Sequence, residues 1–281
     1  MRESMIMLVD RRELSIADYG AEDGPAVLYF HGAPSSRLDA LMYEDEIDAS
    51  GIRVVAIDRP GFGGSSPQPG RVLADWPNSV AQVADQLGLE SFAVVGASAG
   101  GVHAIACAAL LADRVTSLGL VCAGTDPSWP GTASRHSDEE NSVMATDDEE
   151  TVIAWFAGRF GADASRYPIG GAGLPAPDAA MFDDARYGPG IVSSTKEALR
   201  QGVAGLALDK LVRSRPWTFD PGSIDARCEI IHGEQDTVAP VANGEHNATL
   251  IPNATLTRLP EHGHLSILTE IPRLATRLTT T

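Results

Sequence analysis

The chain contains a series of short, continuous apolar runs, and these constrain its fold more than any other feature of the sequence. Residues 53–58 and 91–96 are two of them, each rich in valine and each followed by glycine and small or polar residues. Runs of this length without polar alternation are typical of strands buried on both faces of a parallel sheet. The pattern predicts strands at residues 5–9, 14–19, 26–31, 53–58, 91–96, 115–122 and 227–232.

Segments with helical patterns lie between these runs. They are expected at residues 38–49, 71–87, 99–111, 240–250 and 265–278. Strand and helix therefore alternate along the chain. This alternation predicts an α/β protein in which a mostly parallel central sheet is flanked by helices.

The alternation is interrupted between residues 124 and 220, where the sequence has helical segments and no strand-like run. Capping boxes are expected at residues 137–140, 146–149 and 194–197, and they explain the acidic runs more simply than a metal site does. We therefore predict a core of residues 1–123 and 221–281, and a helical cap of residues 124–220 inserted after the sixth strand. Such a cap would lie over the carboxyl ends of the strands, where ligands bind in open α/β sheets.

Charge and cysteine content narrow the classes of function and the expected location. The formal charge of −17 argues against a nucleic-acid partner, because neutralising phosphates requires clustered lysine and arginine. Three cysteines, each among apolar residues, fit reduced thiols in a cytoplasmic protein. No apolar run is long enough to span a membrane, so no membrane partner is expected. The pattern leaves monomer and homodimer equally open.

A serine between small residues is the strongest chemical signal. Gly96-Ala97-Ser98-Ala99-Gly100 follows an apolar strand and opens an apolar helix. This is the context that the G-x-S-x-G nucleophile elbow requires, because the sharp turn leaves room only for glycine on either side. The pattern predicts that Ser98 is a nucleophile.

Four further motifs accompany the serine motif in a fixed order. They are His31-Gly-Ala-Pro34, Asp58-Arg-Pro-Gly-Phe-Gly-Gly-Ser65, His232-Gly-Glu-Gln-Asp236 and Gly263-His264. With them the chain resembles the α/β-hydrolase fold superfamily, and within it the cap-bearing esterase and haloperoxidase-like branch. The resemblance implies an oxyanion hole formed by the backbone amides of Ala33 and Ala99, and it implies no cofactor.

The resemblance also implies the other two members of a catalytic triad. The order serine, aspartate, histidine along the chain assigns the acid to Asp236 and the general base to His264. Asp126, just past the sixth predicted strand, is the alternative acid. His262 is the alternative base, although the family histidine follows a glycine, as His264 does.

Substrate contacts are less well defined by the sequence. His31, Trp129, Trp155 and Trp217 are candidates, although His31 could instead brace the oxyanion loop and the tryptophans could be core residues. The remaining histidines His103, His136, His232 and His246 have no metal-ligand spacing, and no metal is expected. Arg159 and Asp209 lie in otherwise apolar stretches without an evident role.

These residues together favour a serine hydrolase that cleaves an ester or similar acyl bond of a small molecule through an acyl-enzyme. Carbon–carbon bond hydrolysis and cofactor-free perhydrolysis on the same triad are the alternatives among enzymes. The His31–Pro34 loop has fewer glycines than is usual in the carbon–carbon hydrolases. A receptor that keeps the triad and only binds a small ligand is the alternative outside enzymes.

Overall fold

A single sheet of eight strands forms the centre of the computed structural model, which describes residues 1–131 and 137–280. The strand order is β1-β2-β4-β3-β5-β6-β7-β8. β2 pairs antiparallel with β1 and with β4, and every pair from β4 to β8 is parallel. The strands are β1 Arg2–Met7, β2 Glu13–Gly20, β3 Ala26–Phe30, β4 Arg53–Ile57, β5 Phe92–Ala97, β6 Val115–Val121, β7 Arg227–Gly233 and β8 Ala254–Leu259. The prediction of a mostly parallel sheet is confirmed.

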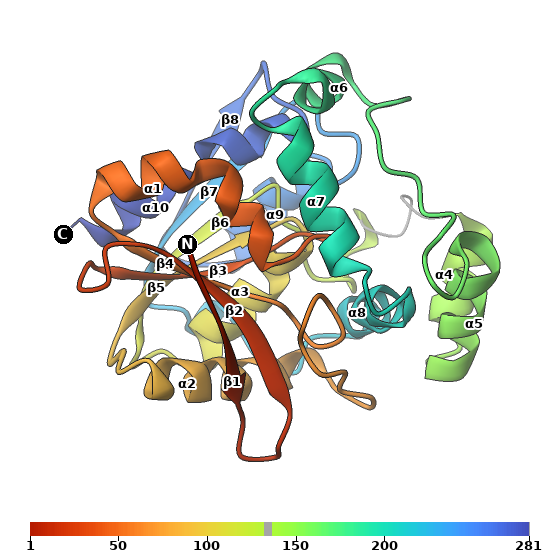
Figure 1. Ribbon diagram of the computed structural model, residues 1–281, viewed down its shortest axis with the longest axis horizontal. Helices are drawn as coiled ribbons and strands as arrows, with labels where there is room; N and C mark the ends of the chain where they lie inside the picture. The colour runs from red at the N-terminus through yellow and green to blue at the C-terminus, as the bar shows by residue number, and fades with distance from the viewer. Residues whose placement is uncertain (132–136, 281) are drawn as a thin grey trace.

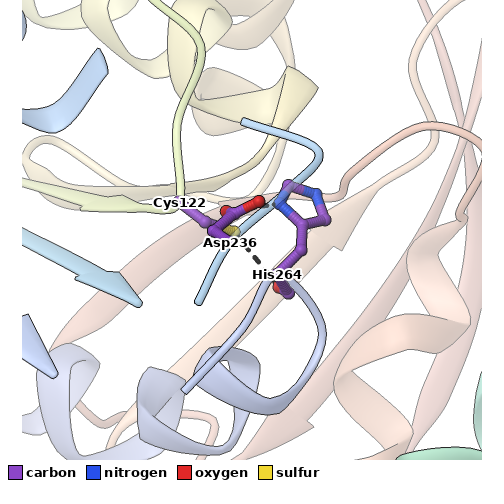
Figure 2. A group of neighbouring side chains, drawn as sticks. All are labelled: Cys122, Asp236 and His264. Carbon is purple, nitrogen blue, oxygen red and sulfur yellow. Dashed lines mark hydrogen bonds and ion pairs between the residues drawn. The ribbon is translucent and has the colours of Figure 1, made fainter. Parts of the chain in front are cut away.

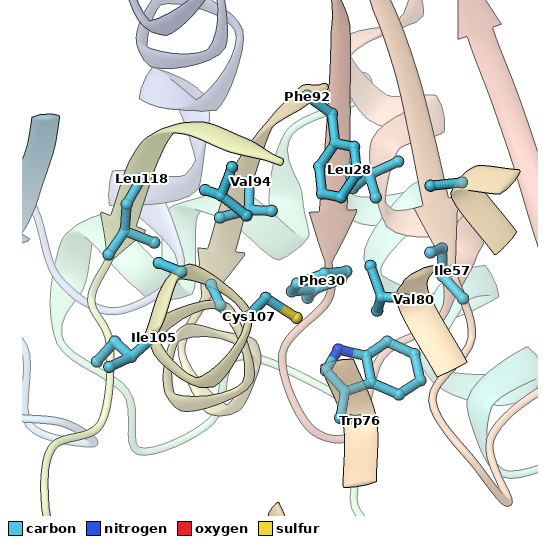
Figure 3. Packing of buried hydrophobic residues seen from close by; sticks show 14 of the residues in the cluster. Leu28, Phe30, Ile57, Trp76, Val80, Phe92, Val94, Ile105, Cys107 and Leu118 are labelled. Atoms are coloured by element: carbon cyan, nitrogen blue, oxygen red, sulfur yellow. The ribbon is translucent and has the colours of Figure 1, made fainter. Parts of the chain in front are cut away.

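Helices cover both faces of this sheet (Figure 1). Neighbouring residues of one strand point into different layers: Val94 packs with α2 and α3, whereas Val95 packs with α1 and α10. Figure 3 shows the first layer, in which Trp76 and Cys107 lie beside Phe30 of β3. The elements outside the insertion are η1 Arg37–Tyr43, α1 Glu44–Ser50, η2 Leu73–Asp75, α2 Trp76–Gln86, α3 Ala99–Leu110, η4 Pro221–Ser223, α9 Ala242–Leu250, η5 Ser266–Glu270 and α10 Ile271–Thr279.

The segment between β6 and β7 consists of helices joined by loops, and its described residues contain no strand. Its helices are α4 Asp138–Met144, α5 Glu149–Phe160, α6 Ala176–Asp183, α7 Gly188–Ala198 and α8 Ala204–Ser214. In Figure 1, α8 lies between the sheet and the pair α4 and α5. The helices α6 and α7 lie above α8 in the same view. Phe62, in the loop after β4, is fully buried in a cluster that includes Phe156 of α5 and Leu206 of α8. The insertion is thus packed onto the loops that follow the strands.

The structure corrects the strand assignment at both ends of the sheet. β8 was not predicted, because its residues alternate between half-buried and exposed positions and include threonine and arginine. An edge strand of this kind lacks the continuous apolar run used to find the others. The first strand begins at Arg2 and ends at Met7, and Val9 lies outside it with 88% exposure.

The helix starts inside the insertion agree only in part with the expected capping boxes. Ser137 caps α4 as predicted and accepts a hydrogen bond from the Glu140 amide. The cap of α5 is Asp148 and not Thr146, which bonds to a carbonyl one turn back. The box at 194–197 was wrong, because Ser194 lies inside α7, which begins at Gly188.

Two findings bear on the expected environment of the chain. The cysteines Cys107, Cys122 and Cys228 are buried, and none forms a disulfide. Within residues 1–131 and 137–280, no helix has the length and apolar character needed to cross a lipid bilayer.

Candidate active site

Ser98 lies at the turn from β5 into α3 and has a strained backbone. Its φ is 50° and its ψ is −117°, a conformation that residues with a side chain rarely adopt. The Ser98 amide donates to the Val121 carbonyl at 2.8 Å, which ties the turn to β6. A Cβ atom at Gly96 would lie 2.4 Å from the Gly100 carbonyl, and one at Gly100 would lie 2.0 Å from the Phe30 carbonyl. The two glycines therefore make the sharp turn possible.

A chain of short hydrogen bonds joins Ser98 to His264 and Asp236. The Ser98 Oγ lies 2.9 Å from Nε2 of His264, and the Nδ1 of that ring lies 2.7 Å from Oδ2 of Asp236. The other carboxylate oxygen accepts the amides of Val238 and Ala239 at 2.8 Å each. The imidazole therefore donates from Nδ1 and is left to accept the serine proton at Nε2.

The negative charge of Asp236 and the protonated form of His264 stabilise each other. Burial alone would raise the pKa of Asp236, but hydrogen bonds from His232 and His264 lower this pKa below its usual value. Burial alone disfavours the charged imidazole, yet the neighbouring Cys122 and Asp236 together outweigh it and hold the pKa of His264 well above its usual value. Asp236 is therefore an ionised partner for a histidine that gains a proton.

The alternative acid and base are not part of this hydrogen-bonded chain. Asp126 lies in a turn, where its carboxylate accepts the Ser128 amide at 2.9 Å. Nδ1 of His262 forms no hydrogen bond in the described part of the chain, and the backbone of this residue bonds to Leu259 and Gln235. The geometry thus brings together the three residues that the family order indicated.

The loop that holds Ala33 lies beside Ser98. A Cβ atom added to Gly32 would lie 3.5 Å from the Ser98 Cβ. Ala99 is the first residue of α3. In the part of the chain that the structure describes, the amides of Ala33 and Ala99 donate no hydrogen bond, so both can bind a developing oxyanion.

His31 lies behind this loop, which corrects its assignment as a substrate contact. Its side chain is fully buried, with Nδ1 2.7 Å from the Gly32 carbonyl and Nε2 accepting the Arg59 amide at 3.2 Å. Burial and the Arg59 charge lower the pKa of His31 well below its usual value, so the ring stays neutral. The alternative interpretation of His31, as a brace for the oxyanion loop, fits these contacts.

Arg59 and Asp209 form a buried ion pair, which explains why an aspartate lies in the otherwise apolar stretch around residue 209. The Arg59 Nε lies 2.9 Å from the Asp209 carboxylate, and both side chains are fully buried. The same guanidinium donates to the carbonyls of His31 and Gly32. Asp209 belongs to α8, so this pair joins the inserted helices to the loop of Ala33.

The three candidate tryptophans have different surroundings. Trp217 stacks on Phe219 and packs with Leu73 and Val102 in an apolar cluster, which fits the alternative interpretation as a core residue. Trp129 stacks on the His246 ring at 4.4 Å. Trp155 lines a pocket between α5 and α8.

This pocket reaches the oxyanion loop and has a volume of about 210 Å³. Its wall combines aromatic and charged side chains with Ala33, and the full lining is Ala33, Glu140, Trp155, Phe156, Arg159, Phe160, Tyr167, Leu206, Lys210 and Arg213. A larger hollow of about 460 Å³ lies at the opposite ends of the strands, beside Ala26 and Phe92. Because Ser98 follows the carboxyl end of β5, it lies at the same end of the sheet as the smaller pocket and at the opposite end from the larger hollow.

Asp178, a fully buried residue of α6, was not predicted to belong to the site. Its carboxylate accepts the amides of His264 at 2.7 Å and of Leu265 and Ser266 at 2.9 Å. A Cβ atom at Gly263 would lie 2.5 Å from this carboxylate, which explains the glycine before His264. That glycine was the one local signal of a close neighbour.

Cys122 lies next to Asp236 and His264, and these residue types can bind a transition metal (Figure 2). The Nδ1 of His264 is already hydrogen-bonded to Asp236, and the Cys122 thiol donates to the His264 carbonyl at 3.5 Å. Burial raises the pKa of Cys122, so the sulfur keeps its proton. The contacts fit a serine–histidine–aspartate chain better than a metal centre. His136 lies outside the described residues.

Comparison with known proteins agrees with this fold. Residues 25–164 match the family described as the alpha/beta hydrolase fold. A non-heme haloperoxidase of Rhodococcus erythropolis is 26% identical over 262 residues, which cover 91% of this chain and 90% of the relative. A bifunctional esterase/perhydrolase of Acinetobacter calcoaceticus is 25% identical over 266 residues, with coverage of 91% and 90%.

Solved structures share the fold at lower identity. A thermophilic esterase from Thermogutta terrifontis superposes with a TM-score of 0.73 at 23% identity, over 99% of this chain and 97% of that one. A bromoperoxidase from Bacillus anthracis gives a TM-score of 0.72 at 18% identity, over 99% of both chains.

Proposed function

Because this chain belongs to the α/β-hydrolase superfamily, we propose that it is a serine esterase that cleaves a small-molecule ester through a covalent acyl-enzyme. The observation that carries the proposal is the hydrogen-bonded chain from Ser98 through His264 to Asp236. A serine hydroxyl is a weak nucleophile at neutral pH, and an imidazole within hydrogen-bond distance can remove its proton during attack.

The reaction has two halves. In acylation, the Ser98 oxygen attacks the ester carbonyl, its proton passes to Nε2 of His264, and the ester oxygen leaves as an alcohol after taking that proton. In deacylation, water attacks the acyl-enzyme, gives its proton to the same nitrogen and releases the acid, and Ser98 regains the proton. The amides of Ala33 and Ala99 are placed to bind the carbonyl oxygen when it becomes negative. No step needs a cofactor.

The pocket between α5 and α8 supports a finer proposal about the substrate. Its wall has three cationic side chains, of which Lys210 pairs with Glu140 and Arg213 pairs with Asp209 at 2.9 Å each, so Arg159 is the cation that remains for a ligand. Arg159 stacks over the rings of Trp155 and Phe160, and no carboxylate in the described part of the chain pairs with it. We therefore propose that the acyl part lies in this pocket, and that a short acyl chain ending in a carboxylate is preferred.

A panel of p-nitrophenyl esters tests both proposals. Neutral acetate and butyrate esters report esterase activity, and they should be turned over faster than the palmitate ester because the pocket is small. The mono-p-nitrophenyl ester of succinate, compared with its methyl ester, reports the preference for a carboxylate. We expect kcat/KM to favour the acid by about fivefold, as expected for roughly 1 kcal/mol from a partly exposed charge pair.

Two variants test whether the charge of Arg159 causes the preference for the succinate ester. Arg159→Gln should remove the preference for the succinate ester, whereas Lys196→Gln should keep it, because Lys196 is an exposed residue of α7 outside the pocket. Turnover of neutral esters without a preference for the acid would refute the pocket proposal alone. Absence of turnover for every ester would refute the esterase and favour a receptor.

Perhydrolysis is a second candidate because two relatives are named for haloperoxidase and perhydrolase activity. In that reaction hydrogen peroxide replaces water in deacylation and releases a peracid from the same acyl-enzyme. Production of peracetic acid from acetate ester and peroxide, at a rate above ester hydrolysis, would make this the main activity. Carbon–carbon hydrolysis has no observation in its favour.

A further inference from the structure

A carboxylate of the inserted helices binds the backbone that carries His264. Asp178 of α6 has no exposed surface, and its Oδ2 accepts the His264 amide at 2.7 Å. Its Oδ1 accepts the amides of Leu265 and Ser266 at 2.9 Å each and the Ser266 hydroxyl at 3.0 Å. All of these donors belong to the loop between β8 and α10, so one side chain fixes three consecutive residues.

The charge of Asp178 is not balanced by a cation. In residues 1–131 and 137–280, no lysine, arginine or histidine side chain forms an ion pair with it. Burying an unpaired carboxylate is costly unless several hydrogen bonds satisfy it, as they do here. Four donors point at this side chain and use both of its oxygens, whereas an asparagine would turn its amide nitrogen toward one of them. A carboxylate is therefore the group that can hold this part of the chain.

The backbone that Asp178 holds determines where the His264 ring can lie. Asp236 orients the His264 ring through Nδ1. The position of the ring also depends on the backbone of His264, which Asp178 holds. The base must stay within hydrogen-bond reach of Ser98, and a small displacement of a reacting group can cost about 10²-fold in rate. A second carboxylate close to His264 also favours the imidazolium that forms during attack.

We propose that Asp178 is a positioning residue for the general base, through which α6 of the inserted segment sets both the place and the proton affinity of His264. The inference rests on the proposed esterase function, because it assumes that His264 is the base. The ionisable groups that contact His264 are Asp236 from the loop after β7, Cys122 from the end of β6 and Asp178 from α6. Cys122 keeps its proton, so Asp178 and Asp236 are the two negative neighbours.

Asp178→Asn tests the proposal because it keeps the size of the side chain and removes its charge. Asp183→Asn is the matched control, since it removes the same charge from an exposed position at the end of the same helix. Folding is checked by circular dichroism and thermal unfolding, and kcat and KM are measured on p-nitrophenyl acetate across pH. We expect Asp178→Asn to lower kcat by about 10- to 100-fold while KM changes less than about threefold.

The pH profile gives the readout that anchoring alone would not move. Loss of the negative charge should shift the acid limb of kcat/KM to lower pH, because the imidazolium is less favoured. Asp183→Asn should match the wild type in rate and profile. A folded Asp178→Asn protein with lower thermal stability but unchanged kcat and acid limb would show that Asp178 only anchors the loop.

A second variant decides the matter if Asp178→Asn does not fold. Gly263→Ala places a methyl group 2.5 Å from the carboxylate and displaces it without removing it. We expect its kcat to fall with KM preserved, and an unchanged kcat in a folded protein would overturn the proposal. The rate at which a fluorophosphonate labels Ser98 is measured in parallel. If the wild type is labelled but hydrolyses no ester, the esterase proposal fails by itself, and slower labelling of the variants still tests Asp178.

Discussion

At the scale of single residues, His264 is held through its ring and through its backbone. Asp236 contacts the ring, and Asp178 contacts the amide. The first contact could be predicted, because the order of serine, aspartate and histidine is a feature of the sequence. The second could not, because Asp178 lies 86 residues away in a segment with no recognisable motif. Gly263 marks the place but not the partner.

Two histidines two residues apart provide a residue-scale prediction. His264→Ala should remove nearly all esterase turnover, whereas His262→Ala should change it by less than about tenfold, or roughly 1.4 kcal/mol in the barrier. The reason is that only His264 contacts the Ser98 hydroxyl. Initial rates on p-nitrophenyl acetate measure the difference. The opposite ranking of the two variants would identify His262 as the general base.

The pH dependence of kcat/KM is a second prediction at this scale. His264 must be neutral to accept the Ser98 proton, and its pKa is raised by the neighbouring Cys122 and Asp236 even though burial opposes the rise. Activity should therefore be lost as pH falls through this raised pKa, with a midpoint above the ordinary 6.5. Asp236→Asn should move the limb to lower pH and reduce kcat by roughly 10⁴-fold, the loss measured for this change in a serine protease. An acid limb below 6.5 in the wild type would contradict the assigned charges.

At the scale of elements, the sheet was predictable where strands are buried on both faces and was missed where one face is exposed. β5 and α3 followed from apolar runs around a serine motif, and both are observed. β8 was not predicted because its exposed positions carry polar residues. The start of α7 was misplaced because Ser194 resembles a cap, yet its hydroxyl bonds to Ser35 and Ser36 across the molecule. Local patterns do not reveal such distant partners.

The ion pair between Arg59 and Asp209 gives the prediction at this scale. Asp209→Asn leaves a fully buried guanidinium without its counter-charge, and the loss of one partner of a buried pair costs about 3–5 kcal/mol. We expect the free energy of unfolding in urea to fall by that amount. Activity should fall as well, because Arg59 also binds the carbonyls of His31 and Gly32. A loss below about 1 kcal/mol would mean that this pair does not fix α8 to the oxyanion loop.

At the scale of the whole molecule, the inserted helices contact the site at two separated points. Asp209 of α8 reaches the loop of Ala33 through Arg59, and Asp178 of α6 reaches the loop of His264. We propose on this basis that residues 124–220 form a cap that is part of the catalytic apparatus as well as its cover. The division into core and cap followed from the missing strands, whereas these two contacts depend on tertiary packing that the sequence pattern does not encode.

Metal removal is the prediction for the intact protein. Cys122, Asp236 and His264 offer ligand types for a transition metal, but their atoms are engaged in hydrogen bonds with one another. We expect esterase activity to be unchanged after dialysis against EDTA and after addition of zinc or manganese. Activity that is lost on chelation and restored by one metal would show that these three residues form a metal centre.

The covalent intermediate on Ser98 tests the central claim most directly. The enzyme is mixed with p-nitrophenyl butyrate, quenched in acid within milliseconds to seconds, and digested for mass spectrometry, with Ser98→Ala treated in the same way. The account predicts a butyryl group on the peptide that contains Ser98, no such adduct in the variant, and a loss of turnover of roughly 10⁶-fold, as found when a triad nucleophile is removed from a protease. Turnover by Ser98→Ala above a tenth of the wild-type rate, or an acyl group on any other residue of an active enzyme, would contradict it.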